Sequence, residues 1–212
     1  MVRDEELEQY AATLYSDALP YHNFNHALDC ITAGRELMRR CREEGVAVDE
    51  AVVYYALLFH DAGYHEDHLR KGHPTKEAYS AALAEEALRR RGLPPATVRK
   101  VTDAILATRR DARFVSVEQK VVRAADLAGL AADYGVFRSN TEKLKTEYEI
   151  LMGRPVSWDE WIDMADEVLS FFLSQDIRLT RYYFDENGDS IFHKRTRANL
   201  DRLRAERSSG RD

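Results

Sequence analysis

The sequence predicts an all-α protein, and three of its features carry that prediction. Apolar residues recur at spacings of three and four residues through almost the whole chain, which is typical of amphipathic helices. Strand-like alternation of apolar and polar residues is nearly absent. Only ten Gly and five Pro occur among 212 residues, of which 44% are hydrophobic and 32% charged. This composition is typical of a soluble, helix-rich protein.

Each predicted helix in the first half of the chain has a periodic apolar face, and most have a signal at one end. Gly45 is a C-terminal stop for the second helix, and Asp49 is the N-cap of the third. Thr75 and Gly92 bracket the fourth, and the pair Pro94 and Pro95 opens the fifth. The predicted helices run over residues 4–18, 24–44, 49–60, 75–92 and 95–108.

The second half contains four further predicted helices. A turn is expected at MGRPVSW, residues 152–158, because Gly, Pro and Ser separate two periodic stretches there. No internal repeat or low-complexity linker divides the chain, so a single domain is expected over residues 1–206. Apolar periodicity is lost over 207–212, which predicts a frayed tail. The predicted helices run over 118–134, 138–152, 158–175 and 190–206.

Charge and hydropathy exclude several classes of partner. A formal net charge of −6 argues against general binding of nucleic-acid polymers or anionic membranes, although a small anionic substrate remains compatible. No stretch approaches the roughly 20 apolar residues of a membrane span, and the acidic start lacks a signal-peptide pattern. A cytoplasmic location is therefore expected. Cys30 and Cys41 lie on one predicted helix, about 16 Å apart, which predicts reduced thiols rather than a disulfide.

Histidines are concentrated near the N-terminus. Six of the seven lie between positions 22 and 73, in the stretches YHNFNH, LLFHDAGYHEDH and KGHP. His60 and Asp61 end a strongly apolar run. Adjacent side chains on a helix diverge by about 100°, so both can reach one ion only at the helix end. Imidazole and carboxylate donors favour manganese, cobalt, nickel, iron or magnesium, with zinc less favoured.

Two further candidate ligands lie on other predicted helices. Asp126 stands in an apolar turn, where a buried carboxylate needs a cation or hydrogen-bond donors to compensate it. His26 lies at the start of the second helix, three residues after Asn23. Taken singly, Asp126 is equally explained as a helix cap and His26 as a packed side chain. A metal site therefore depends on all the candidates acting together.

In combination, these residues resemble the HD superfamily of metal-dependent phosphohydrolases. The order YHNFNH, FHDAGY, AADLA matches the family's His, His-Asp and Asp ligands, and KEAYSAA and TRANL are similar to elements of a subgroup of small bacterial members. The resemblance implies a single-domain helical HD fold and hydrolysis of a small phosphate ester, such as a nucleotide. It also implies one divalent metal ion, held by four ligands: His26, His60, Asp61 and Asp126.

The chain departs from many HD proteins in having no His between His73 and His193, so a second metal is not expected in the usual manner. Phosphate charge would then need arginine, which binds phosphate bidentately. Arg109 and Arg110 lie in the matching stretch AILATRRDARF. Helical phase favours Arg109, four residues after Ile105, as the catalytic and substrate-binding arginine. A solvated helix end is the alternative.

Other candidates flank the four expected ligands. His65 is the predicted general acid, because histidine is the side chain most often used for proton transfer near neutral pH. The acid–base roles of HD nucleotidases are not carried over, because Tyr64 stands where their Glu is expected. Glu77 is predicted to orient a ligand or the water, or to be a favourable charge at a helix N-terminus. His22 and Asn23 are predicted to contact substrate or ligands, with a helix N-cap as the alternative for Asn23.

Three functions remain compatible with the sequence. The first is hydrolysis of a small phosphate ester. The second is a dinuclear HD-type enzyme, either a cyclic-nucleotide phosphodiesterase or an oxygenase. The third is a sensory module that binds metal or nucleotide without turnover. The substrate and the oligomeric state, a homo-oligomer included, are left open by the sequence.

Overall fold

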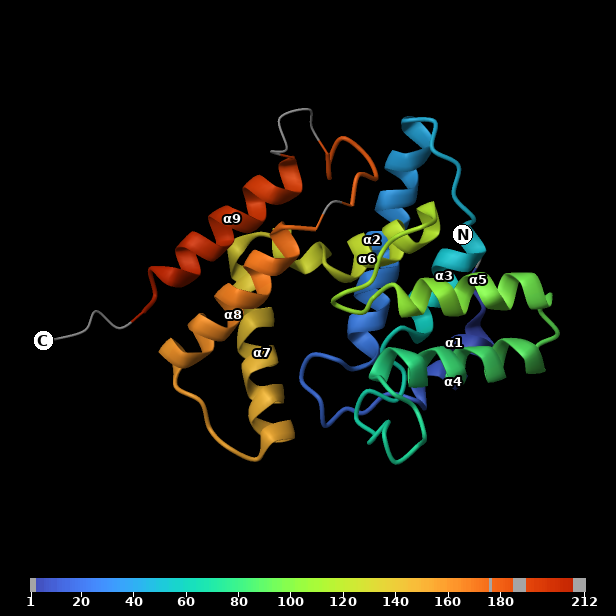
Figure 1. Ribbon diagram of the computed structural model, residues 1–212, viewed down its shortest axis with the longest axis horizontal. Coiled ribbons are helices and arrows are strands. Elements are labelled where there is room, and N and C mark those ends of the chain that lie inside the picture. Colours follow the sequence, from blue (N-terminus) through green and yellow to red (C-terminus); the bar gives the residue numbers. More distant parts are fainter. Residues whose placement is uncertain (1–2, 176, 185–189, 208–212) are drawn as a thin grey trace, which may run out of the picture. The chain divides into compact units, whose positions relative to one another are not determined.

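The described part of the chain, residues 3–175, 177–184 and 190–207 of a computed structural model, is helical and contains no β-strand (Figure 1). The all-α prediction is therefore confirmed. The described helices are α1 (Glu5–Ala12), α2 (Phe24–Glu43), α3 (Glu50–Phe59), α4 (Lys76–Arg90), α5 (Pro95–Leu106), α6 (Val117–Asp126), the 3₁₀-helix η1 (Ala128–Ala131), α7 (Tyr134–Met152), α8 (Trp158–Leu173) and α9 (Ile191–Arg204).

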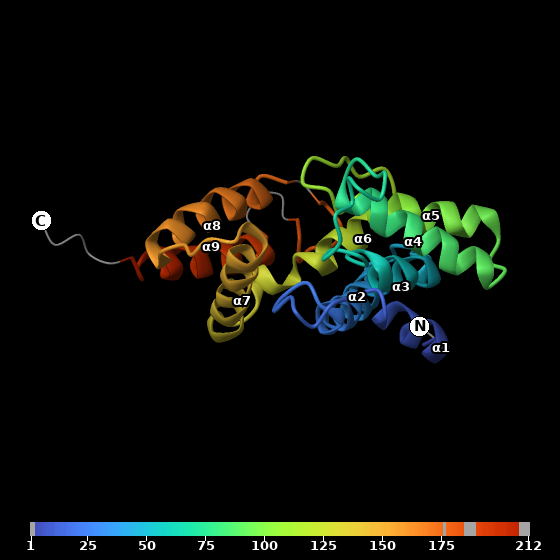
Figure 2. The ribbon, with the colours of Figure 1, turned by 90° about the horizontal axis from the view of Figure 1, so that it is seen from below.

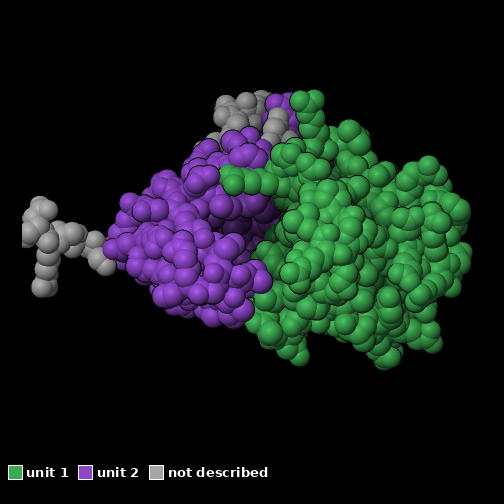
Figure 3. Space-filling view, turned by 60° about the horizontal axis from the view of Figure 1, so that its bottom comes forward, with its two compact units in different colours: residues 1–126 green, residues 127–212 purple. Residues whose placement is uncertain are grey.

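The chain forms two compact units, residues 1–126 and 127–212, which Figure 3 distinguishes by colour. The expected single domain over 1–206 stays a prediction. Of the tail expected to fray, only Arg207 is described, and it pairs with Asp163; residues 208–212 lie outside the described residues. No helix in the described ranges is both long enough and apolar enough to cross a membrane.

Helix α3 is the centre of the first unit. It packs against α2, α4, α5 and α6 and also contacts α1 (Figures 1 and 2). Its sequence, EAVVYYALLF, is apolar on nearly every side, as a helix surrounded by others requires. Gly34 permits the close packing of α2 on α3, because a Cβ there would lie 2.6 Å from Cδ1 of Leu57. The packing of these helices on α3 therefore fixes where their ends lie.

The predicted end signals are confirmed in the first unit. Asp49 and Thr75 accept hydrogen bonds from the first turns of α3 and α4. Pro95 is the first residue of α5. Gly45 and Gly92 have φ of 72° and 73°, a conformation that glycine adopts without strain.

Three predicted helix boundaries are wrong by several residues. The first helix ends at Ala12 rather than at residue 18. Beyond it, the hydroxyls of Thr13 and Ser16 bond to nearby backbone groups, which competes with helix continuation. The helix predicted over 118–134 divides into α6 and η1, and α7 begins at Tyr134 instead of residue 138. The carbonyls of Leu130 and Ala132, at this break, accept hydrogen bonds from the side chain of Asn199 in α9.

The second unit packs α8 and α9 around an apolar core. Its buried members are Phe137, Ile162, Ala165, Leu169, Leu200 and Leu203. Asn199 of α9 is buried, and its amide donates to the carbonyls of Leu130 and Ala132 at 2.9 Å each. The Asn of the TRANL element therefore holds the η1 turn within this unit.

Candidate metal centre

The His60–Asp61 pair lies at the C-terminal end of α3, as the sequence predicts. His60 is the C-cap and Asp61 follows it in a turn, and both side chains are buried. Gly63 continues that turn with φ of 73°, where a Cβ would lie 2.6 Å from the Tyr79 ring. The hydroxyl of Ser80, from the KEAYSAA element, donates to the carbonyl of Ala62 at 2.8 Å. These contacts fix the turn that carries Asp61.

The four expected ligands converge in the first unit. Nε2 of His26 lies 3.7 Å from Oδ2 of Asp61 and 3.5 Å from Oδ1 of Asp126. Nε2 of His60 lies 3.1 Å and 3.6 Å from the same two oxygens. His26 comes from the first turn of α2, and Asp126 is the last residue of α6. Three separate helices, α2, α3 and α6, thus bring these side chains to one place.

The hydrogen bonding of His60 directs its Nε2 toward this group. Its Nδ1 lies 2.8 Å from the carbonyl oxygen of Leu57, which can only accept, so Nδ1 carries a proton. Nε2 is buried and has no hydrogen-bond partner among the described residues. A buried imidazole held in this way by a backbone carbonyl is typical of a metal ligand.

The electrostatics of the group favour added positive charge. Burial alone would raise the pKa of Asp61, but Lys76, His60 and His22 hold it well below its usual range. Burial also opposes a charged His26, yet Cys30 and Asp126 raise the pKa of that imidazole to about 10. Two buried carboxylates are compensated here either by protons on the imidazoles or by a cation. The residues present therefore fit a divalent ion.

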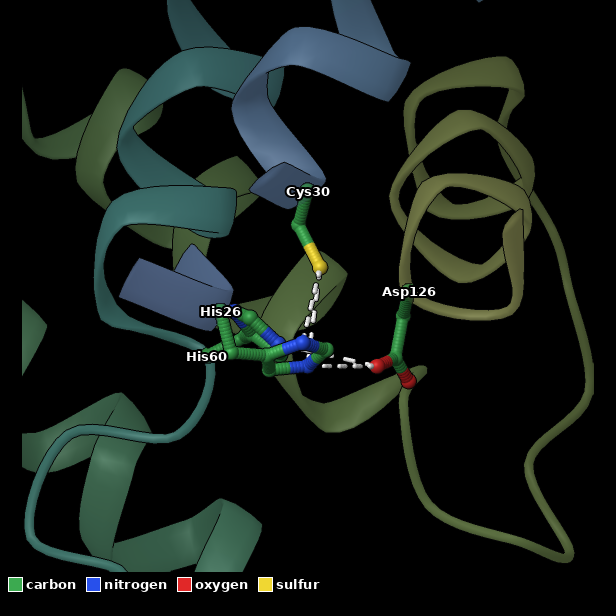
Figure 4. A group of neighbouring side chains, drawn as sticks. All are labelled: His26, Cys30, His60 and Asp126. Atoms are coloured by element: carbon green, nitrogen blue, oxygen red, sulfur yellow. Dashed lines mark hydrogen bonds and ion pairs between the residues drawn. The ribbon is translucent and has the colours of Figure 1, made fainter. Parts of the chain in front are cut away.

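Cys30 is a neighbour of this group that the sequence analysis missed. Its Sγ lies 3.5 Å from Nε2 of His26, one helical turn earlier on α2. His26, Cys30, His60 and Asp126 each offer a ligand atom, all within 4.8 Å of one another (Figure 4). Cys30 and Cys41 are free thiols on one helix, as expected. The spacing of His26 and Cys30, four residues on one predicted helix, was the available signal.

Lys76 also lies beside the group and was not singled out from the sequence. Its Nζ is 3.2 Å from Oδ1 of Asp61 and 3.4 Å from Oε1 of Glu77, and it lies over the Tyr64 ring. The side chain is 37% exposed, so the ammonium group adjoins both the buried carboxylate and solvent. Its place in the first turn after the histidine-rich loop was the signal in the sequence.

Arg123 is the arginine that the structure places near the ligands. It is 2% exposed and lies one turn before Asp126, with Nη1 3.7 Å from Oδ2 of that carboxylate. The same Nη1 donates to the carbonyl of Thr108 at 2.5 Å. Arg123 therefore fixes the last turn of α6 and compensates part of the Asp126 charge. A charged residue within the apolar stretch VVRAAD was the signal that sequence reasoning passed over.

No described contact joins Arg109 to these ligands. Helix α5 ends at Leu106, so the helical phase that was expected to aim Arg109 inward does not reach it. Its guanidinium is 43% exposed and pairs with the exposed Asp111, at 2.9 Å. Arg110 is exposed as well. The inward orientation predicted for Arg109 is wrong, and the alternative, a solvated helix end, describes it.

The remaining candidate site residues differ in whether they lie near the four expected ligands. His22 stacks on Tyr64, with ring centroids 4.1 Å apart, and its ring lies 5.6 Å from that of His26. Glu77 is buried beside Lys76. Asn23 caps α2: its carbonyl oxygen accepts from two backbone amides and its NH₂ group donates to Leu19 and Pro20. Asn23 is therefore a helix N-cap, which was the alternative to contact with the substrate or ligands. His65 is exposed in the loop, and no described contact joins it to the four ligands.

Comparison with models of protein families gave no match, and comparison with curated protein sequences gave none either. The resemblance to the HD superfamily thus rests on the residues quoted from the sequence.

Proposed function

We propose that this chain is a metal-dependent hydrolase of a small phosphate ester, such as a nucleotide, with one divalent ion held by His26, His60, Asp61 and Asp126. The convergence of two imidazole nitrogens and two carboxylate oxygens within 3.1–3.7 Å supports this proposal. The buried Nε2 of His60, which faces the two carboxylates without a hydrogen-bond partner among the described residues, is the observation that carries it. When bound, such an ion supplies Lewis acidity for attack of water on phosphorus.

The side chains around the ligands position them. The carbonyl of Leu57 fixes the ring orientation of His60, and Lys76 holds one oxygen of Asp61 while the other faces the two imidazoles. Arg123 orients Asp126 from the preceding turn. Partners of this kind keep ligands in place and so support metal affinity.

Lys76 is the proposed contact for the phosphate group. A single ion leaves a phosphate dianion incompletely neutralised, and a nearby ammonium supplies further charge. Lys76 lies 3.2 Å from Asp61 and is partly exposed, whereas Arg109 pairs with Asp111. We therefore transfer to Lys76 the phosphate-binding role that the sequence suggested for Arg109. His22, which stacks on the same Tyr64 ring, is a second candidate for contact with the substrate.

The proposal is tested with a panel of phosphate mono- and diesters, assayed with manganese, cobalt, nickel, iron, magnesium and zinc. Hydrolysis of at least one ester is expected with one bound ion per chain, and a chelator should abolish it. His60→Ala should lose both the ion and the activity. Asp103→Ala, which removes an exposed carboxylate from α5, is the control and should retain both. Two tightly bound ions per chain would favour the dinuclear alternative. A bound ion without turnover of any ester would favour the sensory module.

The expected surroundings of the protein belong to the same proposal. A net charge of −6 supports a small substrate over nucleic-acid polymers or membranes, and a cytoplasmic location is proposed with it. Fractionation of cells that produce the full chain tests the location.

A further inference from the structure

Cys30 lies beside the candidate metal ligands, but it is not one of the ligands that the sequence pattern predicts. It is buried on α2, one turn after His26. Figure 4 shows its sulfur directed into the group formed by the two imidazoles and Asp126. A cysteine at this place is either a small apolar residue or a ligand, and the surrounding atoms distinguish the two.

The first distinguishing observation is independent of the cysteine. Nε2 of His60 is buried, without a hydrogen-bond partner among the described residues, and it lies within 4.8 Å of the sulfur, of the His26 nitrogen and of an Asp126 oxygen. Nδ1 of the same ring already bonds to Leu57. Nε2 therefore faces the space that the Cys30 sulfur also borders.

The spacing of the donor atoms is the second observation. Zinc lies about 2.3 Å from sulfur and about 2.0–2.1 Å from imidazole nitrogen, which at a tetrahedral angle separates the two donors by about 3.5 Å. The distance from Sγ of Cys30 to Nε2 of His26 is 3.5 Å. For nitrogen and oxygen donors the corresponding separation is about 3.4 Å, and Oδ1 of Asp126 lies 3.5 Å and 3.6 Å from the two imidazole nitrogens. These three separations are those expected of ligands that share one ion, and the ligand atoms of the whole group lie within 4.8 Å of one another.

We propose that the Cys30 thiolate is a ligand of the same ion, and that the site consequently takes zinc or a zinc-like ion in preference to magnesium. The inference rests on the metal site of the proposed function and deepens it. Thiolate ligands favour zinc, whereas magnesium favours an all-oxygen set. The thiol proton is released to solvent when the ion binds. Asp61 remains a ligand beside His60, so Cys30 is added to the four ligands of the proposed function, and Lys76 stays on the other oxygen of Asp61.

Cobalt(II) is the probe, because a thiolate bound to cobalt gives a near-ultraviolet charge-transfer absorption that nitrogen and oxygen ligands do not give. The full-length protein is titrated with cobalt to one ion per chain. The absorption is expected in the unmodified protein and in Cys41→Ser, the matched control for a buried thiol on the same helix. Cys30→Ser should still bind cobalt through the remaining donors but lack the absorption.

A competition experiment measures selectivity. Equilibrium dialysis should show zinc affinity falling by at least about tenfold in Cys30→Ser, since even partners outside the ligand set affect metal affinity on that scale. Magnesium affinity should change less. Stoichiometric cobalt binding without charge-transfer absorption in the unmodified protein would overturn the thiolate ligand and leave the proposed function standing. Absence of any cobalt binding would overturn both. The first of these outcomes needs no variant, so a folding defect in Cys30→Ser does not obscure the test.

Discussion

The two units of the molecule differ in how their buried polar side chains are grouped. In the second unit, Asn199 donates to two backbone carbonyls and the hydroxyl of Thr141 donates to the carbonyl of Phe137. In the first unit, two imidazoles lie together with two carboxylates and with Cys30. Buried polar groups that bond to the backbone stabilise a fold, whereas a cluster of imidazoles and carboxylates suits a metal ion. The metal site proposed above therefore belongs to the first unit.

The largest effect is expected from Asp61→Ala. If the first unit holds a catalytic ion, kcat/KM should fall by about 1,000-fold or more, because a bound ion contributes several kcal/mol to stabilisation of the transition state. Circular dichroism should show that the helices remain, since Asp61 lies in a turn beyond α3. Asp103→Ala is the matched control. A variant with full activity and no bound ion would contradict the role of the site.

Lys76→Met tests whether the cation beside the ligands acts on the substrate. The loss of a charged phosphate contact should lower kcat/KM by about 10- to 100-fold. Arg109→Met is the matched comparison, because Arg109 is also a partly exposed cation but pairs with Asp111. Steady-state kinetics should show little change in that variant. Equal losses in the two variants would return the phosphate-binding role to the arginine.

Asn199→Ala tests the structural side of the comparison. Removal of the amide leaves the carbonyls of Leu130 and Ala132 without this donor, so the free energy of unfolding should fall by about 1 to 2 kcal/mol. Arg195→Ala, at an exposed position of the same helix, is the control. Urea denaturation measures both. A variant of unchanged stability that had lost turnover would assign Asn199 to the chemistry instead.

The smallest effect on stability is expected from Glu36, an exposed carboxylate in the same unit as Asp61. The hydrogen bonds and charges of Arg39 and Arg40 lower the pKa of Glu36 to about 2. The folded state thus favours the ionised form, and its contribution is present above pH about 4.5 and is lost as pH falls toward about 2.

Because Glu36 is 45% exposed, solvent screening limits the effect of Glu36→Gln to less than about 1 kcal/mol at neutral pH. Urea denaturation at pH 7 and at pH 3 should show a smaller difference between variant and parent at the lower pH. A difference that grows as the pH falls would contradict the ion pairs.

The sequence correctly predicted the helix ends that depend only on neighbouring residues. The caps Asp49 and Thr75 and the glycine stops act within one turn of their own helix, so composition and spacing reveal them. It failed for the break after Asp126, because the carbonyls of that segment bond to Asn199, about 70 residues later in the chain. It failed for Arg109 because the end of α5 carries no strong signal in the sequence.

The sequence alone determined the all-α class, since helical periodicity is a local property. Through its resemblance to the HD superfamily, it also predicted the ligands His26, His60, Asp61 and Asp126. Only the tertiary structure decided that Cys30 and Lys76 border the same group while Arg109 does not. Which side chains share a space depends on how α2, α3, α4 and α6 pack. That packing is set by side-chain volumes on several helices at once, such as the close approach at Gly34, and no single stretch of sequence records it.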